Sequence, residues 1–166
     1  MSAPTKTQIA GLAAAAVLIP AAAFGETVSA SLPVSVTVPG ACQVTATPLN
    51  FGAYDPTAAS DVDSTASIQV LCTVGTSYTV ALGAGAGTGA TISTRRMMKG
   101  TDALGYALYQ DASRTINWGE TPGTDTPPAT TAGATAASHT VYGRIAGGQN
   151  VPGGAYTDTV TVTVNY

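Results

Sequence analysis

Charged residues are scarce in this sequence, at 9% of its 166 residues, and aromatic residues reach only 6%. A soluble helical domain needs Glu, Lys and Arg on its exposed faces, so the composition argues against a helical fold. The six Lys and Arg are outnumbered by nine Asp and Glu and form no basic stripe that could hold phosphates. The sequence therefore predicts no nucleic-acid partner.

Residues that carry out catalysis or hold metals are also few. His139 is the single histidine, Cys42 and Cys72 are the two cysteines, and no G-x-S-x-G nucleophile motif occurs. A catalytic thiol or a zinc site would need further His or Cys partners. We therefore expect no enzyme activity, no metal, no cofactor and no small-molecule substrate, although two carboxylates brought together by folding stay open as a catalytic pair.

The sequence is instead rich in turn residues, with 19 glycines and 10 prolines, and in Ala, Thr, Ser and Val. Short strands can expose Thr and Ser and can be joined by Gly-rich turns, so we predict an all-β fold. The length suits one domain.

Residues 1–25 have the organisation of a secretory signal peptide, with Lys6 ahead of an apolar run from Ile9 to Ala23. The run is shorter than the roughly 20 residues that span a bilayer, which disfavours a membrane anchor. The small residues around Phe24 place the cleavage site after Gly25, with a competing site after Ala23. We predict export, with a mature chain that begins at Glu26.

An exported chain reaches an oxidising compartment, where two cysteines have one possible pairing. We therefore predict a disulfide between Cys42 and Cys72. A loop of about 30 residues closed in this way is worth roughly 3 to 4 kcal/mol in the chain-entropy model.

The mature chain begins with a long run in which every second residue is apolar. Its apolar members are Val28, Ala30, Leu32, Val34, Val36 and Val38. Period 2 is typical of a strand with one buried face, but Pro33 lacks an amide donor and would be resisted in a central strand. Pro39-Gly40 ends the run. We treat residues 26–39 as an extension and residues 40–166 as the domain.

Further strands follow at short intervals, separated by turn residues. They are predicted at residues 41–46, 67–74, 78–82, 103–109, 139–146 and 155–166, with a short extended segment at 115–119. Gly75-Thr76-Ser77 predicts a hairpin between the second and third of these strands. Residues 83–89 and 120–137 are predicted to be loops. About seven strands and one disulfide favour an immunoglobulin-like β-sandwich.

The last predicted strand reaches the end of the chain. Its inward face is predicted to carry Tyr156, Val160, Val162, Val164 and Tyr166. No residues are left for a closing strand, and a sandwich without one exposes an apolar groove and unpaired backbone groups. The alternating segment of residues 26–39 has the composition to fill such a groove in another copy, which is donor-strand complementation.

Two charged groups invite a functional interpretation. Arg95, Arg96 and Lys99 form the one basic cluster, which we interpret as a solvated strand end rather than a site for anionic sugars or lipid. Asp61 and Asp63 lack the glycine-centred acidic loop of a calcium site.

Two aromatic side chains, those of His139 and Trp118, also allow a functional and a structural interpretation. His139 has no evident partner and is expected on the surface rather than in a pH sensor. Trp118 could stack on a sugar, but packing within the sandwich is the safer prediction.

The order of several short motifs resembles the spore coat protein U domain family, which includes the major subunits of archaic, Csu-like chaperone-usher pili. The motifs are Gly40-Ala41-Cys42, Leu49-Asn50-Phe51-Gly52-Ala53-Tyr54, Val70-Leu71-Cys72-Thr73, residues 104–111, Asn117-Trp118-Gly119, residues 141–145, and Gly154-Ala155-Tyr156-Thr157-Asp158-Thr159-Val160. The resemblance covers essentially the whole mature chain.

The resemblance implies an incomplete immunoglobulin-like pilin. Such a subunit passes through the periplasm with a chaperone, reaches an outer-membrane usher, and joins identical subunits head to tail in an extracellular pilus that supports adhesion and biofilm formation. It also implies that Cys42 and Cys72 form the family disulfide, that residues 28–38 are the donor strand, and that Val160, Val162, Val164 and Tyr166 contact a chaperone or neighbour. A secreted spore- or cell-surface coat protein and a monomeric carbohydrate-binding β-sandwich stay open as alternatives.

Overall fold

The computed structural model describes residues 25–166 and divides the chain into two units, Met1–Val36 and Thr37–Tyr166. The predicted signal peptide, residues 1–25, lies outside the described residues except for Gly25. Residues 25–36 contain no helix and no strand, and their side chains are exposed. The second unit carries all the described secondary structure.

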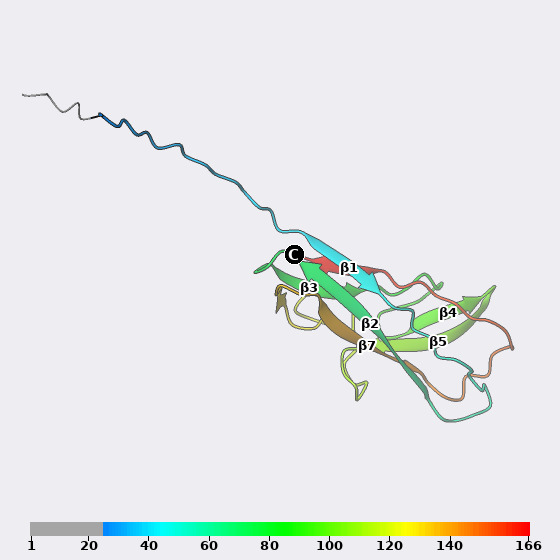
Figure 1. Ribbon diagram of the computed structural model, residues 1–166. Helices are drawn as coiled ribbons and strands as arrows, with labels where there is room; N and C mark the ends of the chain where they lie inside the picture. Colours follow the sequence, from blue (N-terminus) through cyan, green and yellow to red (C-terminus); the bar gives the residue numbers. More distant parts are fainter. Residues whose placement is uncertain (1–24) are drawn as a thin grey trace, which may run out of the picture. The chain divides into compact units, whose positions relative to one another are not determined.

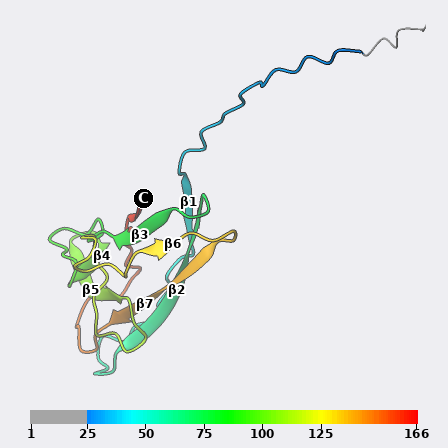
Figure 2. The same cartoon turned by 90° about the vertical axis from the view of Figure 1, so that its left-hand side faces the viewer.

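The second unit is built from strands alone, which confirms the all-β prediction. The strands are β1 (Cys42–Ala46), β2 (Val62–Cys72), β3 (Ser77–Leu82), β4 (Arg95–Lys99), β5 (Asp102–Tyr109), β6 (Thr130–Thr131), β7 (Ala137–Ile145) and β8 (Val162–Asn165). They form a five-stranded sheet in the order β1-β2-β7-β5-β4 and a three-stranded sheet in the order β6-β3-β8 (Figures 1 and 2). Every pairing within them is antiparallel.

The hydrophobic core lies between the two sheets and follows from the alternation of each strand. Ile68 and Val70 of β2 face Tyr78 and Leu82 of β3, and all four are 1–2% exposed. Trp118 is 1% exposed and its indole N–H donates to the Val80 carbonyl over 2.8 Å. The prediction that Trp118 packs inside the sandwich is therefore confirmed, and it cannot stack on a sugar from this position.

The hairpin predicted around Gly75-Thr76-Ser77 is wrong. β2 pairs with β1 and β7, whereas β3 pairs with β6 and β8 in the other sheet. Gly75, with φ of 83°, helps the chain to turn across the core instead of back along β2. Alternation could not distinguish the two arrangements, because strands that face each other across a core show the same pattern as strands that share a sheet.

The C-terminal strand is shorter than predicted. β8 covers only Val162–Asn165, and Thr157 pairs separately with Met98 of β4. Tyr166 lies outside the strand and is 65% exposed, so the prediction that it shares the inward face is wrong. The predicted 120–137 loop also contains a short strand, β6.

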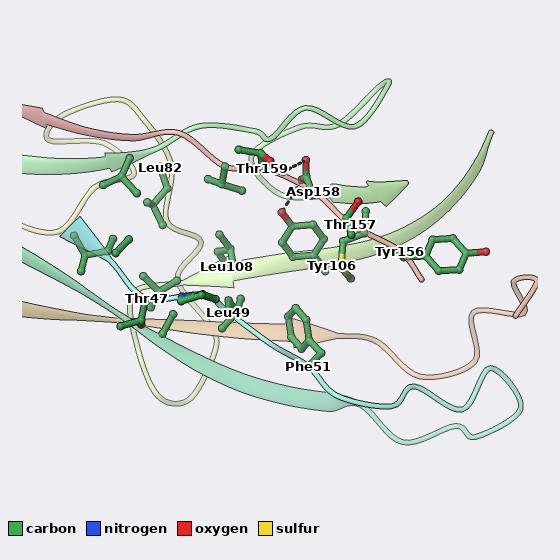
Figure 3. A pocket seen from close by; sticks show the side chains of 18 residues that line it. Thr47, Leu49, Phe51, Leu82, Tyr106, Leu108, Tyr156, Thr157, Asp158 and Thr159 are labelled. Atoms are coloured by element: carbon green, nitrogen blue, oxygen red, sulfur yellow. Dashed lines mark hydrogen bonds between the residues drawn. The ribbon is translucent and has the colours of Figure 1, made fainter. Parts of the chain in front are cut away.

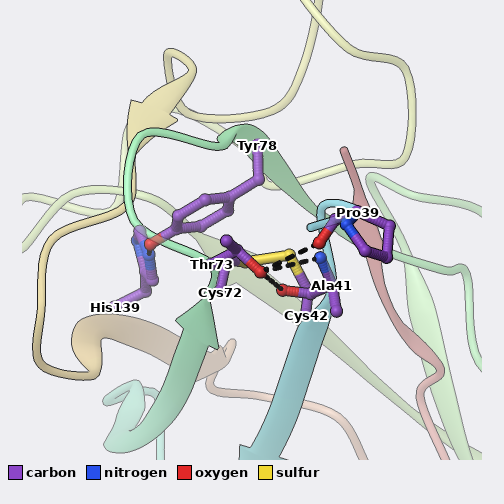
Figure 4. Close-up of a disulfide and its surroundings, with 7 residues drawn as sticks. All are labelled: Pro39, Ala41, Cys42, Cys72, Thr73, Tyr78 and His139. Atoms are coloured by element: carbon purple, nitrogen blue, oxygen red, sulfur yellow. Dashed lines mark hydrogen bonds between the residues drawn. A yellow bond between two sulfur atoms is a disulfide. The ribbon is translucent and has the colours of Figure 1, made fainter. Parts of the chain in front are cut away.

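The disulfide between Cys42 and Cys72 is present and joins directly opposite residues of β1 and β2 (Figure 4). Beside it, the Ala41 N–H donates to Thr73 Oγ1 over 3.1 Å and the Thr73 N–H donates to the Ala41 carbonyl over 2.8 Å. The beginning of β1 is thus held to the end of β2 by covalent and hydrogen bonds.

Candidate functional site

An open groove runs along one side of the sandwich, between the segment that follows β1 and the segment that precedes β8. Two adjoining cavities, of about 390 and 590 Å³, make up this edge groove. They share the residues Pro48, Leu49, Phe51, Met97 and Tyr156. Together they are large enough to take several side chains of an added segment.

The floor of the edge groove is the hydrophobic core itself. Ile68, Leu82, Leu108 and Val141 lie at the bottom of the smaller cavity, and Leu104 and Ile145 lie at the bottom of the larger one. Figure 3 shows Leu108 and Tyr106 between the two walls. An apolar strand placed here would extend the core rather than cover a polar surface.

The first wall is the Leu49-Asn50-Phe51-Gly52 segment, which packs on Gly143 of β7. A Cβ at residue 143 would lie 2.7 Å from Leu49 Cδ2 and 2.8 Å from Phe51 Cζ, so only glycine leaves room for both side chains. The Asn50 carboxamide oxygen accepts from the Gly52 N–H over 2.8 Å and turns the chain after the wall. This motif therefore shapes the groove.

The second wall is held in place by Asp158. Its Oδ2 accepts from the Tyr106 hydroxyl, and its Oδ1 accepts from the backbone N–H groups of Ala86 and Thr159, each over 2.7 Å. Burial, together with the bond to Asp158, raises the pKa of the Tyr106 phenol far above its ordinary value, so the phenol stays protonated and donates.

Beneath this wall Arg95 is fully buried, which corrects its interpretation as part of a solvated strand end. Its guanidinium donates to the carbonyl oxygens of Leu82, Gly83, Ile92 and Trp118. Burial lowers the pKa of Arg95, and nearby acidic side chains oppose that shift. Arg95 therefore ties the loop after β3 to the core and is not available to an external anion.

The predicted C-terminal contact residues reach the edge groove in part. Val160 and Val162 line it, and Val160, Val162 and Val164 are half-buried against the core. The predicted donor residues belong to the exposed N-terminal unit and its junction. There the exposed fraction is 96% for Val28, 85% for Leu32, 87% for Val34 and Val36, and 71% for Val38, and Ala30 is exposed as well.

His139 is half-buried on β7, so its expected surface position is wrong. Its Nε2 lies 3.0 Å from the Tyr78 hydroxyl, and the two rings pack edge to face. Burial lowers the pKa of His139. Sequence alone could not show this pair, because 61 residues separate its members.

Asp61 and Asp63 serve as ion-pair partners. Arg144 donates to both carboxylate oxygens of Asp63 over 2.8 and 2.9 Å and lies 3.3 Å from Asp61. Arg114 lies 3.2 Å from Asp63. The bond to Arg144 lowers the pKa of Asp63. Within residues 25–166, no group of three or more His, Cys, Asp or Glu side chains is placed to hold a metal ion.

The comparisons with known proteins agree with this architecture. The model of the Spore Coat Protein U domain matches residues 28–163. The chain belongs to the Spore Coat Protein U domain family. A curated member, Protein U of Myxococcus xanthus, is 38% identical over 177 aligned positions that cover 97% of this chain and 98% of that protein. The family predicted from the order of the motifs is thereby confirmed.

A solved structure gives the fold of a similar chain. It is the CsuC–CsuE chaperone–tip adhesion subunit pre-assembly complex from the archaic chaperone-usher Csu pili of Acinetobacter baumannii. The match has a TM-score of 0.55 and 28% identity, and it covers 78% of this chain but only 40% of the other. The chain thus has an all-β fold of the immunoglobulin-like pilin type, and it spans less than half the length of its structural neighbour.

The sequence identifies the residues that shape the groove as parts of family motifs and indicates no role for them. Leu49, Phe51 and Gly143 form one such set, and Tyr106 with Asp158 forms the other. Their order in the sequence was a signal of family membership, but their contacts join residues 52 or more positions apart. Among residues 25–166, this chain has no helix of the length and hydropathy needed to cross a membrane.

Proposed function

We propose that this chain is a structural, non-enzymatic subunit of a surface pilus, in which the edge groove of one copy receives residues 26–39 of another. The observation that carries the proposal is the groove itself, an apolar opening into the core beside strands β1 and β8. Each of these strands pairs with one neighbour among the described residues, so each has a free edge. β-strand addition uses such an edge for backbone bonds and the adjoining pockets for alternate side chains.

Residues 26–39 suit the groove in pattern and in energy. Five of their large apolar side chains are 71–96% exposed in the single chain. Burying one Val or Leu side chain contributes about 1.5 to 3 kcal/mol, so a strand that seats several of them is bound strongly. The intervening Ser and Thr residues would face solvent, as they do on the outer face of an antiparallel sheet.

The proposed contact is heterologous, because the donor segment and the edge groove are different surfaces. A heterologous contact that does not close into a ring generates a filament. Identical subunits joined in this way form a head-to-tail polymer.

Before assembly the open groove requires another cover, because unpaired strand edges and apolar surface promote aggregation. We propose a periplasmic chaperone that contacts Val160, Val162 and Val164, followed by an outer-membrane usher. The support is the family and the structural neighbour, which is a chaperone–subunit complex. In this proposal residues 1–25 direct export, residues 26–39 are the donor, residues 40–166 are the pilin domain, and the polymer supports adhesion and biofilm formation at the cell surface.

A cell- or spore-surface coat protein is the second candidate, because the family is named for a spore coat protein and Protein U aligns with nearly the whole chain. Strand exchange could operate in a coat as well as in a pilus. The monomeric sugar-binding alternative loses its main residue, since Trp118 is buried.

The experiment that tests the proposal compares the native secreted protein on SDS gels before and after boiling, with electron microscopy of the same sample. We expect a ladder of multimers that collapses to one band on boiling, together with thin fibres. Fibres with a ladder indicate a pilus, sheets or amorphous layers with a ladder indicate a coat, and a single unheated monomer band without assemblies contradicts strand exchange.

Removal of residues 26–39 should abolish the ladder while the domain is still exported and its disulfide still forms. Leu32→Asp is expected to have nearly the same effect, because a charge would be buried in the groove without a partner. Ser31→Asp is the matched control, since residue 31 lies on the solvent face of the same segment. Equal multimer yields from the two aspartate variants would contradict insertion of the apolar face.

A further inference from the structure

Pro33 is the one residue between Thr27 and Val38 that lacks a backbone N–H. We infer that Pro33 selects the direction of the inserted segment, allowing entry antiparallel to β8 of the receiving subunit and opposing entry parallel to it. The inference rests on the proposed function and adds a role for one residue, which would suppress insertion of a chain into its own groove.

β8 has a free edge on the side away from β3. The Gly83 N–H donates to the Thr161 carbonyl over 3.0 Å, so the peptide groups of Thr161 face the β3 side. The Leu82 N–H donates instead to the Gly119 carbonyl over 2.8 Å, away from β8. Leu82 is opposite Val162, and the two residues therefore form a non-hydrogen-bonded pair.

Because peptide groups along a strand alternate between its two sides, Val162 and Val164 turn theirs toward the open edge. The same two side chains are half-buried against the core, whereas Thr163 and Asn165 between and after them are exposed. The free edge of β8 thus offers the N–H and C=O groups of its inward-facing residues.

In an antiparallel pair, directly opposite residues share a face and point their peptide groups either both toward or both away from each other. An incoming strand with its apolar face inward would therefore bond β8 through apolar residues such as Leu32 and Val34. Pro33, between them, would face the other wall. Where the segment lies beside residues 47–61, which form no strand, the missing N–H breaks no ladder, whereas beside β1 it would cost one bond.

In a parallel pair, a residue that directs its N–H and C=O at the neighbouring strand bonds to two residues of that strand. They are the residues before and after the one that lies opposite it. The inward residues of the incoming strand would then turn away from β8, and the outward residues, Pro33 among them, would turn toward it. One ladder bond would be lost, and the proline ring would be pressed against a β8 carbonyl.

A chain that filled its own groove would have to use the parallel direction. β1 begins at Cys42, opposite the end of β2, and β8 ends at Asn165, opposite Thr79 at the beginning of β3. Four residues, 73–76, connect β2 to β3, so the beginning of β1 and the end of β8 lie at the same end of the sandwich, as Figure 1 shows.

Residues 39–41 link residue 38 to β1 and reach at most about 11 Å, so residue 38 stays near the end of the groove at which β1 begins. A segment folded back on its own domain would therefore run in the direction of β8. The segment of a second copy has no such restraint. Pro33 thus favours exchange between copies over self-insertion.

The test compares three single variants of the full exported chain with the wild type. Ala30→Pro removes an N–H that the antiparallel register directs at β8, whereas Ser31→Pro removes one directed at the other wall. Ala30→Val controls for the added bulk at residue 30. Pro33→Ser, which matches the serines at 31 and 35, restores the missing donor. The readouts are the unheated SDS ladder and the fraction of single-chain product that resists protease.

We expect Ser31→Pro and Ala30→Val to stay within about twofold of the wild-type multimer yield, and Ala30→Pro to lose roughly tenfold or more. Pro33→Ser should increase the protease-resistant single-chain fraction at the expense of the ladder. A wild-type ladder with equal losses for Ala30→Pro and Ser31→Pro, or with the larger loss for Ser31→Pro, would overturn the inference alone. Absence of a wild-type ladder would overturn the proposed function and this inference together.

Discussion

The two alternating segments, Thr27–Thr37 and residues 156–165, have the same pattern but different structures. Thr27–Thr37 forms no strand, and its large apolar side chains are almost fully exposed. Residues 156–165 repeat the alternation, yet Val160, Val162 and Val164 are half-buried and β8 pairs with β3. Alternation makes a segment able to bury one face, but a ladder also needs a free edge within reach.

The C-terminal segment shows how local contacts divide one pattern between two sheets. Thr157 exchanges backbone hydrogen bonds with Met98 of the five-stranded sheet, whereas Val162–Asn165 pairs with β3 of the three-stranded sheet. Asp158 and Thr159 lie at the crossing, where the carboxylate accepts from the Tyr106 hydroxyl. The segment therefore closes one end of the sandwich and leaves the edge groove open beside it.

The largest effect on the difference between the two segments is expected from removing the disulfide that holds β1, the strand that follows the exposed segment. Replacing both Cys42 and Cys72 by Ser should lower the free energy of unfolding by about 3 to 4 kcal/mol, because the unfolded chain regains the entropy of an open loop. Urea unfolding of the purified chain measures the change, and the Leu32→Asp background is expected to keep that chain monomeric. The single variant Leu32→Asp serves as the reference. A loss below about 1 kcal/mol would show that β1 is held mainly by its backbone ladder.

A smaller effect is expected from a charge placed on the inward face of β8. Val162→Asp should cost about 2 to 3 kcal/mol, because a half-buried carboxylate there has no partner, and it should also block secretion if this face contacts the chaperone. Thr163→Asp, one residue further on the outer face, is the control and should change stability by less than about 0.5 kcal/mol. Normal surface display of the Val162→Asp variant would count against a chaperone contact at this face.

The smallest expected effect is a pH dependence of the free energy of unfolding, which arises in the folded domain and not in the exposed segment. Thr27–Val38 has no titratable side chain, whereas the domain holds the single histidine. Burial lowers the pKa of His139 below its ordinary value of 6.5, so the folded state favours the neutral ring. Its contribution to stability is complete above pH 6.5 and declines as the pH falls toward the lowered pKa.

Urea midpoints at pH 7.5 and 5.5 test this, with His139→Gln as the matched variant. The wild type should be less stable at the lower pH, and the variant should show a smaller difference between the two values. An unchanged difference in the variant would assign the pH dependence to other groups.

Much of the fold could be predicted from the sequence because the responsible signals are local. Period-2 alternation predicted most of the strands, and the presence of two cysteines in a chain predicted to be exported indicated their pairing. The motif order predicted the family. The predicted hairpin failed because alternation shows which face is buried and says nothing of which sheet a strand joins. The predictions that Arg95 and His139 are exposed were wrong because the groups that bury and bond them lie elsewhere in the sequence.

The sequence by itself determined that this chain makes short strands around one apolar core. Its alternation also showed that the N-terminal segment has an apolar face that needs a partner. Only the tertiary structure decided where an opening to that core lies, which walls Gly143 and Asp158 shape, and which peptide groups of β8 remain free. The reason is physical: strand character arises from neighbouring residues, whereas a groove and a free edge are defined by segments that meet only when the two sheets pack.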